Sequence, residues 1–232
     1  MKTIEELIRA HYRGIPLRER AFEIGVEDAI SAGHAQVLDA GCGSTAPLLR
    51  KYSDKCDIIG VDLVRTFPPG VRAITADLRQ LPFPDSSFSL VCSQSVFEHL
   101  TEPQLVLEEF FRVLRPGGLC IISTPNKYDY TSIIAKHSPQ RFHQWFVNRV
   151  FVGDGAYDTF PTVYSANTPR FYRKLEQSGK WSIRDLRGVR HYPANLIFSS
   201  VLFRLGIAYD WAIARLQLTT LQPTLRVILE RL

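Results

Sequence analysis

The sequence lacks the paired cysteines of a zinc site or of a disulfide framework. Its four cysteines, Cys42, Cys56, Cys92 and Cys120, are scattered without CxxC spacing, and each lies in or beside an apolar run. Such a pattern is typical of reduced thiols. We therefore expect a cytoplasmic protein without a metal site.

Long apolar runs are also missing. No uninterrupted run approaches the roughly 18 residues that a membrane-spanning helix requires. The N-terminal residues 1–14 are amphipathic and mixed in charge, unlike the apolar core of a signal peptide. Internal repeats, low-complexity tracts and linkers are absent too. These features predict a single domain over residues 1–232, with an insertion.

Acidic residues are scarce in the second part of the chain. Residues 1–132 contain 14 Lys and Arg against 17 Asp and Glu, a net charge of −3, whereas residues 133–232 contain 14 against 6, a net charge of +8. A basic half attracts an acidic substrate, a phospholipid surface or nucleic acid. A solvated arginine-rich face explains it equally well.

Short apolar strands alternate with helices through the first half of the chain. The expected strands cover residues 36–41, 56–63, 71–77, 88–95 and 119–126. Helices are expected over residues 2–13, 17–32 and 102–114, and in the run that contains Pro47. Continuous apolar runs are typical of strands that are buried on both faces. The pattern thus predicts an α/β fold, a doubly wound and mostly parallel sheet with helices on both faces.

The second half of the chain is less regular. Residues 127–167 have no clean strand pattern, and "RPGG" before the fifth strand reads as a tight turn. Later elements are a helix over 168–179, a strand over 181–189, a helical stretch over 194–217 and a last strand from Thr224.

The first expected strand runs into a glycine-rich turn, "VLDAGCGSTAPLL", residues 37–49. Gly41, Gly43 and Ala46 form the pattern G-x-G-x-x-A, in which the glycines let a ligand approach the backbone closely. Dinucleotide sites, other nucleotide sites and plain tight turns share this pattern. The turn alone therefore leaves the cofactor open.

Three carboxylates at the ends of the first three strands indicate which cofactor the turn binds. Asp39 precedes the turn, Asp62 follows Gly43 by 19 residues, and Asp77 ends the third strand. A pyrophosphate near Asp39 is repelled by roughly 1–4 kcal/mol per close charge pair. S-adenosylmethionine instead carries a sulfonium and an ammonium against one carboxylate. The charges favour S-adenosylmethionine over NAD, with Asp39 facing the positive part, Asp62 taking the ribose diol and Asp77 accepting from the adenine amine.

The run from Val37 to Gly118 resembles the class I S-adenosylmethionine-dependent methyltransferases, especially the group related to ubiquinone and menaquinone biosynthesis. The matching pieces are "VLDAGCG", "GVDL", "ADLRQLPFPDSSFSLV", "SVFEHL" and "VLRPGG", in the family's order. The resemblance implies a Rossmann-like sheet of seven strands whose last strand is antiparallel.

The resemblance also implies a set of cofactor contacts. Asp39, Gly41 and Gly43 contact the methionine part, and Asp62 holds the ribose. Asp77 and the backbone at Leu78 hold the adenine, while Ser93 and Gln94 lie beside the sulfonium. The neighbouring residues Ala40, Cys42 and Leu63 complete the expected cofactor site.

The chain departs from the family pattern after the fifth strand. The insertion over residues 127–167 begins where that strand opens onto the cofactor, so we interpret it as a lid over the methyl acceptor. Its many aromatic residues suggest an apolar or ring-bearing acceptor, although each ring can equally pack inside the lid. Arg141 and Arg149 are available for an anionic group on the acceptor.

Few residues are available as a general base. Glu98 and His99 follow the fourth strand, and His137 and His143 lie in the insertion. We take His143 and His99 as the catalytic candidates, with bracing of the loop as the alternative for His99. An acceptor that is carbanion-like or already ionised needs no base.

A second inserted segment, helical and mostly apolar, covers residues 194–222. It is suited to contact a membrane surface, a lipid acceptor or a second copy of the chain, but we favour plain packing against the sheet.

Together these features predict a methyltransferase for a small-molecule acceptor, with an oxygen on an aromatic, sugar or lipid-linked compound as the expected site. An NAD-dependent oxidoreductase and a catalytically inactive S-adenosylmethionine-binding module are the alternatives. A nucleic-acid methyltransferase is a further possibility, prompted by the basic half of the chain. Nucleic acid is nevertheless not an expected partner: "CSQSVF" after the fourth strand lacks the N/D-P-P-Y/F tetrapeptide, which argues against an amino-base acceptor specifically. A peripheral lipid contact and a homodimer stay open.

Overall fold

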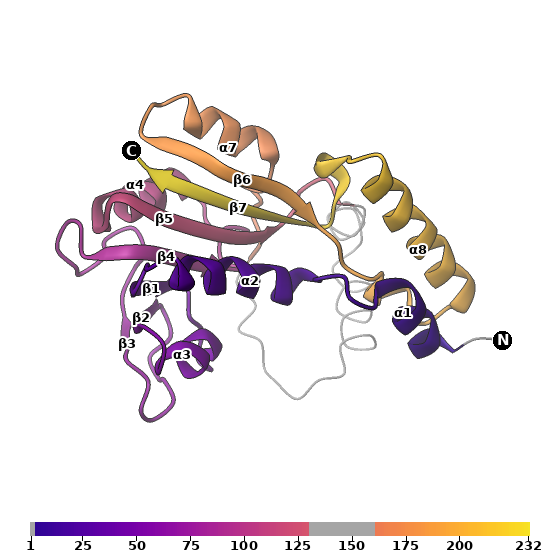
Figure 1. The fold of residues 1–232 in the computed structure, drawn as a ribbon, viewed down its shortest axis with the longest axis horizontal. Coiled ribbons are helices and arrows are strands. Elements are labelled where there is room, and N and C mark those ends of the chain that lie inside the picture. Colours follow the sequence, from indigo (N-terminus) through magenta and orange to yellow (C-terminus); the bar gives the residue numbers. More distant parts are fainter. Residues whose placement is uncertain (1–2, 130–160) are drawn as a thin grey trace.

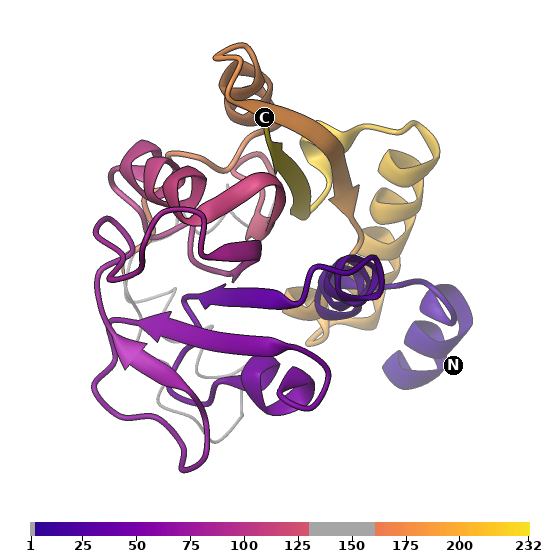
Figure 2. The same ribbon diagram turned by 60° about the vertical axis from the view of Figure 1, so that its left-hand side comes forward.

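A computed structural model describes residues 3–129 and 161–232. Seven strands form one sheet in the order β3-β2-β1-β4-β5-β7-β6 (Figures 1 and 2). Their bounds are β1 Gln36–Ala40, β2 Asp57–Asp62, β3 Ala73–Thr75, β4 Phe88–Gln94, β5 Leu114–Pro125, β6 Trp181–Val189 and β7 Thr224–Arg231. β7 pairs antiparallel with both β5 and β6, and the other pairs are parallel. The predicted doubly wound, mostly parallel sheet with an antiparallel last strand is confirmed.

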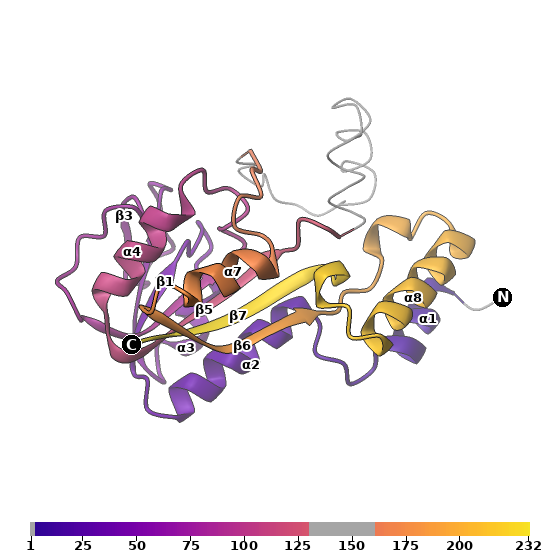
Figure 3. The same cartoon turned by 90° about the horizontal axis from the view of Figure 1, so that it is seen from above.

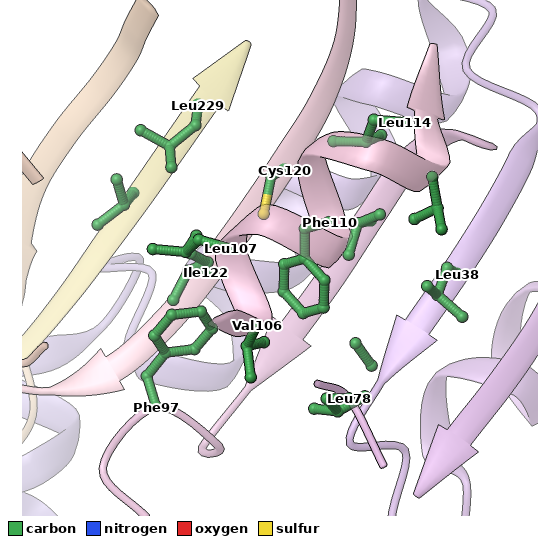
Figure 4. Close-up of a cluster of buried hydrophobic side chains, with 14 of the residues drawn as sticks. Leu38, Leu78, Phe97, Val106, Leu107, Phe110, Leu114, Cys120, Ile122 and Leu229 are labelled. Atoms are coloured by element: carbon green, nitrogen blue, oxygen red, sulfur yellow. The ribbon is translucent and has the colours of Figure 1, made fainter. Parts of the chain in front are cut away.

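Helices cover both faces of the sheet (Figure 3). On one face lie α4 (Pro103–Val113) and α7 (Pro169–Glu176), and on the other lie α2 (Arg18–Ser31) and α3 (Pro47–Tyr52). Figure 4 shows how Val106, Leu107 and Phe110 of α4 pack against strand residues such as Cys120 and Ile122. Each of these side chains is at most 1% exposed. The continuous apolar runs of the strands are thus explained by burial on both faces.

The fifth strand begins earlier than the sequence pattern predicts. β5 starts at Leu114 and includes "RPGG", which we expected to be a tight turn before the strand. Leu114 pairs with Phe88, and the register with β4 then shifts before Leu119 pairs with Leu90. The extra residues form an irregularity in the strand, because Gly117 adopts a φ of +75° that turns the chain without ending its pairing.

The helical segment after β6 does not pack on the sheet as we expected. Its main helix, α8 (Ser200–Arg215), lies beside α1 (Ile4–Tyr12), and the two extend past one end of the sheet (Figures 1 and 3). Leu7 and Tyr12 of α1 form a separate apolar cluster with Phe203 and Ile207 of α8. The two amphipathic helices bury each other's apolar faces, so the sheet is not needed to cover α8.

Two searches of the described residues bear on binding. No helix there is long and apolar enough to cross a membrane. No group of three or more His, Cys, Asp or Glu side chains in residues 3–129 and 161–232 is placed to hold a metal ion.

Candidate functional site

The candidate site lies where the order of the strands reverses. β1 is flanked by β2 and β4, so the chain builds the sheet outward in both directions from β1. Asp39 near the end of β1 is in register with Gly60 of β2 and Cys92 of β4. Open parallel sheets bind their ligands at the carboxyl ends of the strands at such a reversal point.

The glycine-rich turn is held against the end of β2 by backbone bonds. The amides of Gly41 and Cys42 both donate to the carbonyl oxygen of Val61, at 2.8 and 3.2 Å. Gly41 has a φ of +86°, and a Cβ added there would lie 2.1 Å from Cγ2 of Val96. Gly43 has a φ of +67°, but an added Cβ would meet no atom within 4 Å. The first glycine is therefore required by packing, whereas open space lies beside the second.

Both carboxylate oxygens of Asp62 are bound to backbone amides. Oδ2 accepts from the Gly43 amide at 2.7 Å, and Oδ1 accepts from the Val64 amide at 3.2 Å. Asp62 thus fixes the turn as well as standing where a ribose is expected. Each carboxylate oxygen has a second lone pair, so the group can still accept from a diol. The next residue, Leu63, is 57% exposed.

Asp39 is the buried charge of the site. It is 2% exposed, and its Oδ2 has no hydrogen-bond partner. Burial, with a smaller contribution from the nearby charge of Asp62, raises the pKa of Asp39 to about 7 from an ordinary value of 3.8. An unpartnered buried carboxylate is costly, and a cation placed beside it would stabilise its charged form.

Arg79 already binds the Asp77 carboxylate, which is one of the expected adenine contacts. Asp77 receives a bidentate bond from Arg79, with Nη2 to Oδ2 at 2.7 Å, and the Arg79 amide donates to Oδ1 at 2.8 Å. This arginine holds the pKa of Asp77 below its usual value. Leu78 between them is buried, at 8% exposure. An adenine amine therefore has to share the Asp77 carboxylate with Arg79.

The end of β4 supplies the remaining predicted contacts and one that we had not predicted. Ser93 is fully buried, and its Oγ has no hydrogen-bond partner, whereas Gln94 is half-buried. Arg18, at the start of α2, donates to the hydroxyl of Ser95. The sequence gives no signal for this contact, because Arg18 and Ser95 are 77 residues apart.

Glu98 and His99 contact the last part of the inserted segment, residues 161–164. The backbone oxygen of Glu98 accepts from the amides of Val163 and Tyr164, at 2.7 and 3.2 Å. Nδ1 of His99 lies 3.2 Å from the carbonyl oxygen of Pro161. The contact of His99 agrees with the bracing alternative, and its catalytic role stays a prediction.

The Glu98 side chain is buried, at 4% exposure. Its Oε2 accepts from the Thr124 hydroxyl at 3.1 Å, which links the loop after β4 to the end of β5. Burial raises the pKa of Glu98.

The two flanks of the insertion meet at the end of β5. The Lys127 amide donates to the Asn167 carbonyl at 2.9 Å, and the Asn167 side chain donates to the carbonyl of Pro125 at 2.9 Å. Asn126 donates through Nδ2 to the carbonyl oxygens of Thr220 and Gln222, which ties this point to the turn before β7. The insertion therefore enters and leaves at the sheet edge that carries the site. His143, Arg141, Arg149 and His137 lie outside the described residues.

These residues fit a cationic, ribose-bearing group. Asp39 offers an unpartnered buried carboxylate, and Asp62 stands at the end of the adjacent strand. Open space lies beside the turn at Gly43, where an added Cβ would meet no atom within 4 Å. The rim that they form is negative, and a pyrophosphate there would meet Asp39 and Asp62 together. Ala40 and Cys42 are both buried.

Comparison with known proteins agrees with this geometry. A family model described as a methyltransferase domain matches residues 38–122, which include the turn and the strands from β1 to most of β5. A probable S-adenosylmethionine-dependent methyltransferase of Mycolicibacterium smegmatis is 38% identical to this chain over 104 residues. Residues 38–122 are thus similar to a methyltransferase domain. Gly41, Gly43 and Asp62 lie within the matched residues.

The match to curated relatives covers less than half of the chain. The M. smegmatis alignment covers 41% of this chain and 40% of its relative. A malonyl-[acyl-carrier protein] O-methyltransferase of Laribacter hongkongensis is 33% identical over 117 residues, which are 42% of this chain and 39% of that protein. The chain therefore spans about two fifths of the length of the curated relatives that it matches.

The fold extends beyond that match. Geranyl diphosphate C-methyltransferase from Streptomyces coelicolor, solved with Mg²⁺, geranyl diphosphate and S-adenosyl-L-homocysteine, superposes with a TM-score of 0.56. The superposition covers 92% of this chain and 79% of that chain at 13% identity. At this identity the likeness shows a shared methyltransferase fold and nothing about the acceptor.

Proposed function

We propose that this chain transfers the methyl group of S-adenosylmethionine to an oxygen of a small molecule, on an aromatic, sugar or lipid-linked acceptor. The observation that carries the proposal is the buried carboxylate of Asp39, which has one oxygen without a partner and lies beside a glycine-rich turn. A donor with an ammonium group supplies the missing partner, whereas NAD brings phosphates to the same rim.

Each cofactor contact is assigned to an element described above. Asp39 faces the ammonium, and the open side of the turn at Gly43 lies against the methionine part. Asp62 takes the ribose diol with its remaining lone pairs, and the exposed Leu63 covers the ribose or the adenine ring. Asp77 and the Leu78 backbone receive the adenine. Ser93 and Gln94 stand at the end of β4, where we place the sulfonium.

The chemistry asks the chain mainly for alignment and exclusion of water. When bound, the cofactor supplies a methyl group on a sulfonium, which is an intrinsically good leaving group. The chain holds the donor at the sheet edge and orients the acceptor in line with it, and positioning of this kind contributes about 7–11 kcal/mol. Residues 127–167 begin and end at that edge, and we propose that they cover the acceptor within the single domain of residues 1–232.

An oxygen acceptor is supported by the name of one relative, the malonyl-[acyl-carrier protein] O-methyltransferase described above. A small-molecule acceptor is supported by a second relative, a trans-aconitate 2-methyltransferase of Azoarcus, 34% identical over 108 residues. A hydroxyl acceptor loses its proton as the oxygen is methylated, so a general base within reach accelerates the step. His143 is our first candidate and His99 our second. We expect a small molecule rather than nucleic acid as the partner.

The proposal is tested by transfer of a labelled methyl group to panels of phenols, sugars and lipid extracts. We expect one class to be labelled. Mild alkali then distinguishes the products, because it releases the label from a methyl ester and leaves it on a methyl ether. His143→Ala is expected to lower kcat about 10²–10⁴-fold with KM for the donor unchanged, as for loss of a general base. His99→Ala serves as the comparison, because its ring contacts the Pro161 carbonyl.

Two outcomes would each remove one part of the proposal. A kcat near that of the native chain in His143→Ala removes this residue as the base. Binding of NAD in place of S-adenosylmethionine, measured by calorimetry, rejects the assigned donor altogether.

A further inference from the structure

One side of α8 exposes a stripe of apolar side chains. Val201, Leu202, Leu205 and Leu216 are 66%, 40%, 61% and 67% exposed. Val201, Leu202 and Leu205 are spaced by one, three and four residues, which places them on one side of the helix. Leu216 is the C-cap residue that follows α8, three turns after Leu205. The opposite side of α8, with Phe203 and Ile207, is buried against α1. The stripe is therefore a second apolar side, separate from the one that α1 covers.

Cations border this stripe. Arg204 and Arg215 lie on the same helix and are exposed, and neither forms an ion pair with another described residue. The one acidic residue of α8, Asp210, is 4% exposed and is held by Arg190, with Nη2 to Oδ2 at 2.5 Å. The exposed surface of α8 thus consists of apolar side chains and positive charges, without an exposed negative charge.

The neighbouring helix adds exposed arginines near its C-terminal end. Arg9 and Arg13 are exposed at the end of α1, whereas its two glutamates lie in the first turn. Leu7 and His11 of α1 line a pocket together with Arg204 and Trp211 of α8, so the two helices form one continuous surface. Trp211 is 44% exposed on that surface. A tryptophan at the boundary of apolar and cationic residues is typical of helices that lie in a membrane interface.

This surface lies at the same end of the sheet as the candidate site. β6 ends at Val189, which is in register with Thr224 of β7, and Thr224 is in register with Pro125 at the carboxyl end of β5. α8 follows β6, and Figures 1 and 3 place it beyond this end of the sheet. A surface bound by α8 would therefore be close to the edge where the insertion enters and leaves.

We propose that α8, with the end of α1, docks on the surface of an anionic phospholipid bilayer. Val201, Leu202 and Leu205 enter the acyl boundary, and Arg204 and Arg215 extend their apolar stems along it and place their guanidinium groups among the phosphates. Charge complementarity decides between this occupant and a second copy of the chain, because a second copy brings the same cationic rim. The proposal does not depend on the methyl acceptor.

Flotation with vesicles of phosphatidylcholine alone, and of phosphatidylcholine with 30 mol% phosphatidylglycerol, tests the proposal on the full chain. We expect binding to the anionic vesicles that weakens as salt is added. Leu205→Gln is expected to lower the partition coefficient about tenfold, since a leucine is withdrawn from the apolar boundary. Arg204→Gln and Arg215→Gln are each expected to lower it about fivefold.

Matched variants on other helices control for loss of an exposed leucine or arginine. Leu105→Gln on α4 removes a leucine that is 41% exposed, and Arg173→Gln on α7 removes an exposed arginine. Both are expected to bind vesicles like the native chain. Because all of these positions are exposed, each variant is expected to have the same Tm as the native chain. A thermal melt verifies this.

Three results would overturn the proposal. The first is absence of binding to anionic vesicles, and the second is an equal loss of binding in Leu105→Gln and Leu205→Gln. The third is a dimer in sedimentation velocity that Leu205→Gln dissociates, which assigns the stripe to a second copy instead. Donor binding by calorimetry is measured in parallel and is expected to be native in every variant, so the lipid proposal and the proposed activity fail separately.

Discussion

Asp39→Asn is expected to weaken binding of S-adenosylmethionine at least about 100-fold at pH 8. Removing one member of a buried charge pair costs about 3–5 kcal/mol, and 1.4 kcal/mol corresponds to a tenfold change in Kd. Asp39 is nearly fully buried and has no other cationic partner among the described residues, so the donor ammonium is its counter-charge. Calorimetric titration with S-adenosylmethionine measures the loss.

A ligand control separates this role from general damage. Methylthioadenosine keeps the adenine and ribose but lacks the amino-acid part, so its affinity is expected to change by less than about threefold in Asp39→Asn. Equal losses for the two ligands would show that Asp39 maintains the site and does not face the ammonium.

The same variant is expected to be more stable than the native chain at alkaline pH. The pKa of Asp39 is about 7 in the folded chain against 3.8 for an ordinary aspartate, so between these values the folded state binds more protons than the unfolded state. Stability therefore falls as pH rises from about 4 to 7 and stays low above 7. Replacing Asp39 by Asn removes this loss, which is on the order of a few kcal/mol.

For a domain of this size the gain corresponds to a Tm increase of roughly 5–10 °C at pH 8. At pH 4, where Asp39 is protonated in the folded chain, the two proteins are expected to melt together. A lower Tm for Asp39→Asn at pH 8 would contradict a buried, uncompensated charge at this position. Melts across the pH range, followed by circular dichroism, supply the comparison.

Asp62→Ala is expected to weaken both S-adenosylmethionine and methylthioadenosine, by about 100-fold each. Loss of hydrogen bonds from the ribose diol to a charged acceptor costs about 1.5–3 kcal/mol. The substitution also releases the Gly43 amide, which Asp62 binds at 2.7 Å, and so loosens the turn. The sum exceeds the effect of either contact alone.

Asp62→Asn separates the two contributions. Its amide oxygen can still accept from the Gly43 amide, whereas its amide nitrogen cannot accept from the Val64 amide. The contact with the turn is therefore retained while the charged acceptor is lost. We expect Asn to recover about tenfold of the affinity that Ala loses. An unchanged Kd in Asp62→Ala would exclude the ribose role, and a loss restricted to S-adenosylmethionine would move Asp62 to the amino-acid end.

The central half of the fold is predictable because its signals are local. Each strand is a short apolar run, each turn is marked by glycine or proline, and the acidic residues fall at strand ends. Asp39, Asp62 and Asp77 can therefore be placed on one sheet edge from the alternation of elements alone. The antiparallel last strand came from the family resemblance, since no local pattern gives its direction.

Contacts between distant segments escape such prediction. Arg18 forms a hydrogen bond with Ser95, 77 residues later in the chain, and no motif near either residue predicts this bond. The pairing of α1 with α8 joins the two ends of the chain, and each helix by itself is equally suited to cover the sheet. The local pattern also does not predict that the Arg79 side chain binds the Asp77 carboxylate. The sequence shows that the two residues are close along the chain but not which side-chain conformation Arg79 adopts.

The most direct test of a negative site for a cationic donor is the number of protons exchanged when the donor binds at pH 6. At that pH about nine tenths of Asp39, with its pKa of about 7, is protonated in the folded chain. Calorimetry of S-adenosylmethionine binding in two buffers of different ionisation enthalpy is expected to show release of nearly one proton in the native chain and none in Asp39→Asn. Binding without proton release in the native chain would contradict the pairing of Asp39 with the donor.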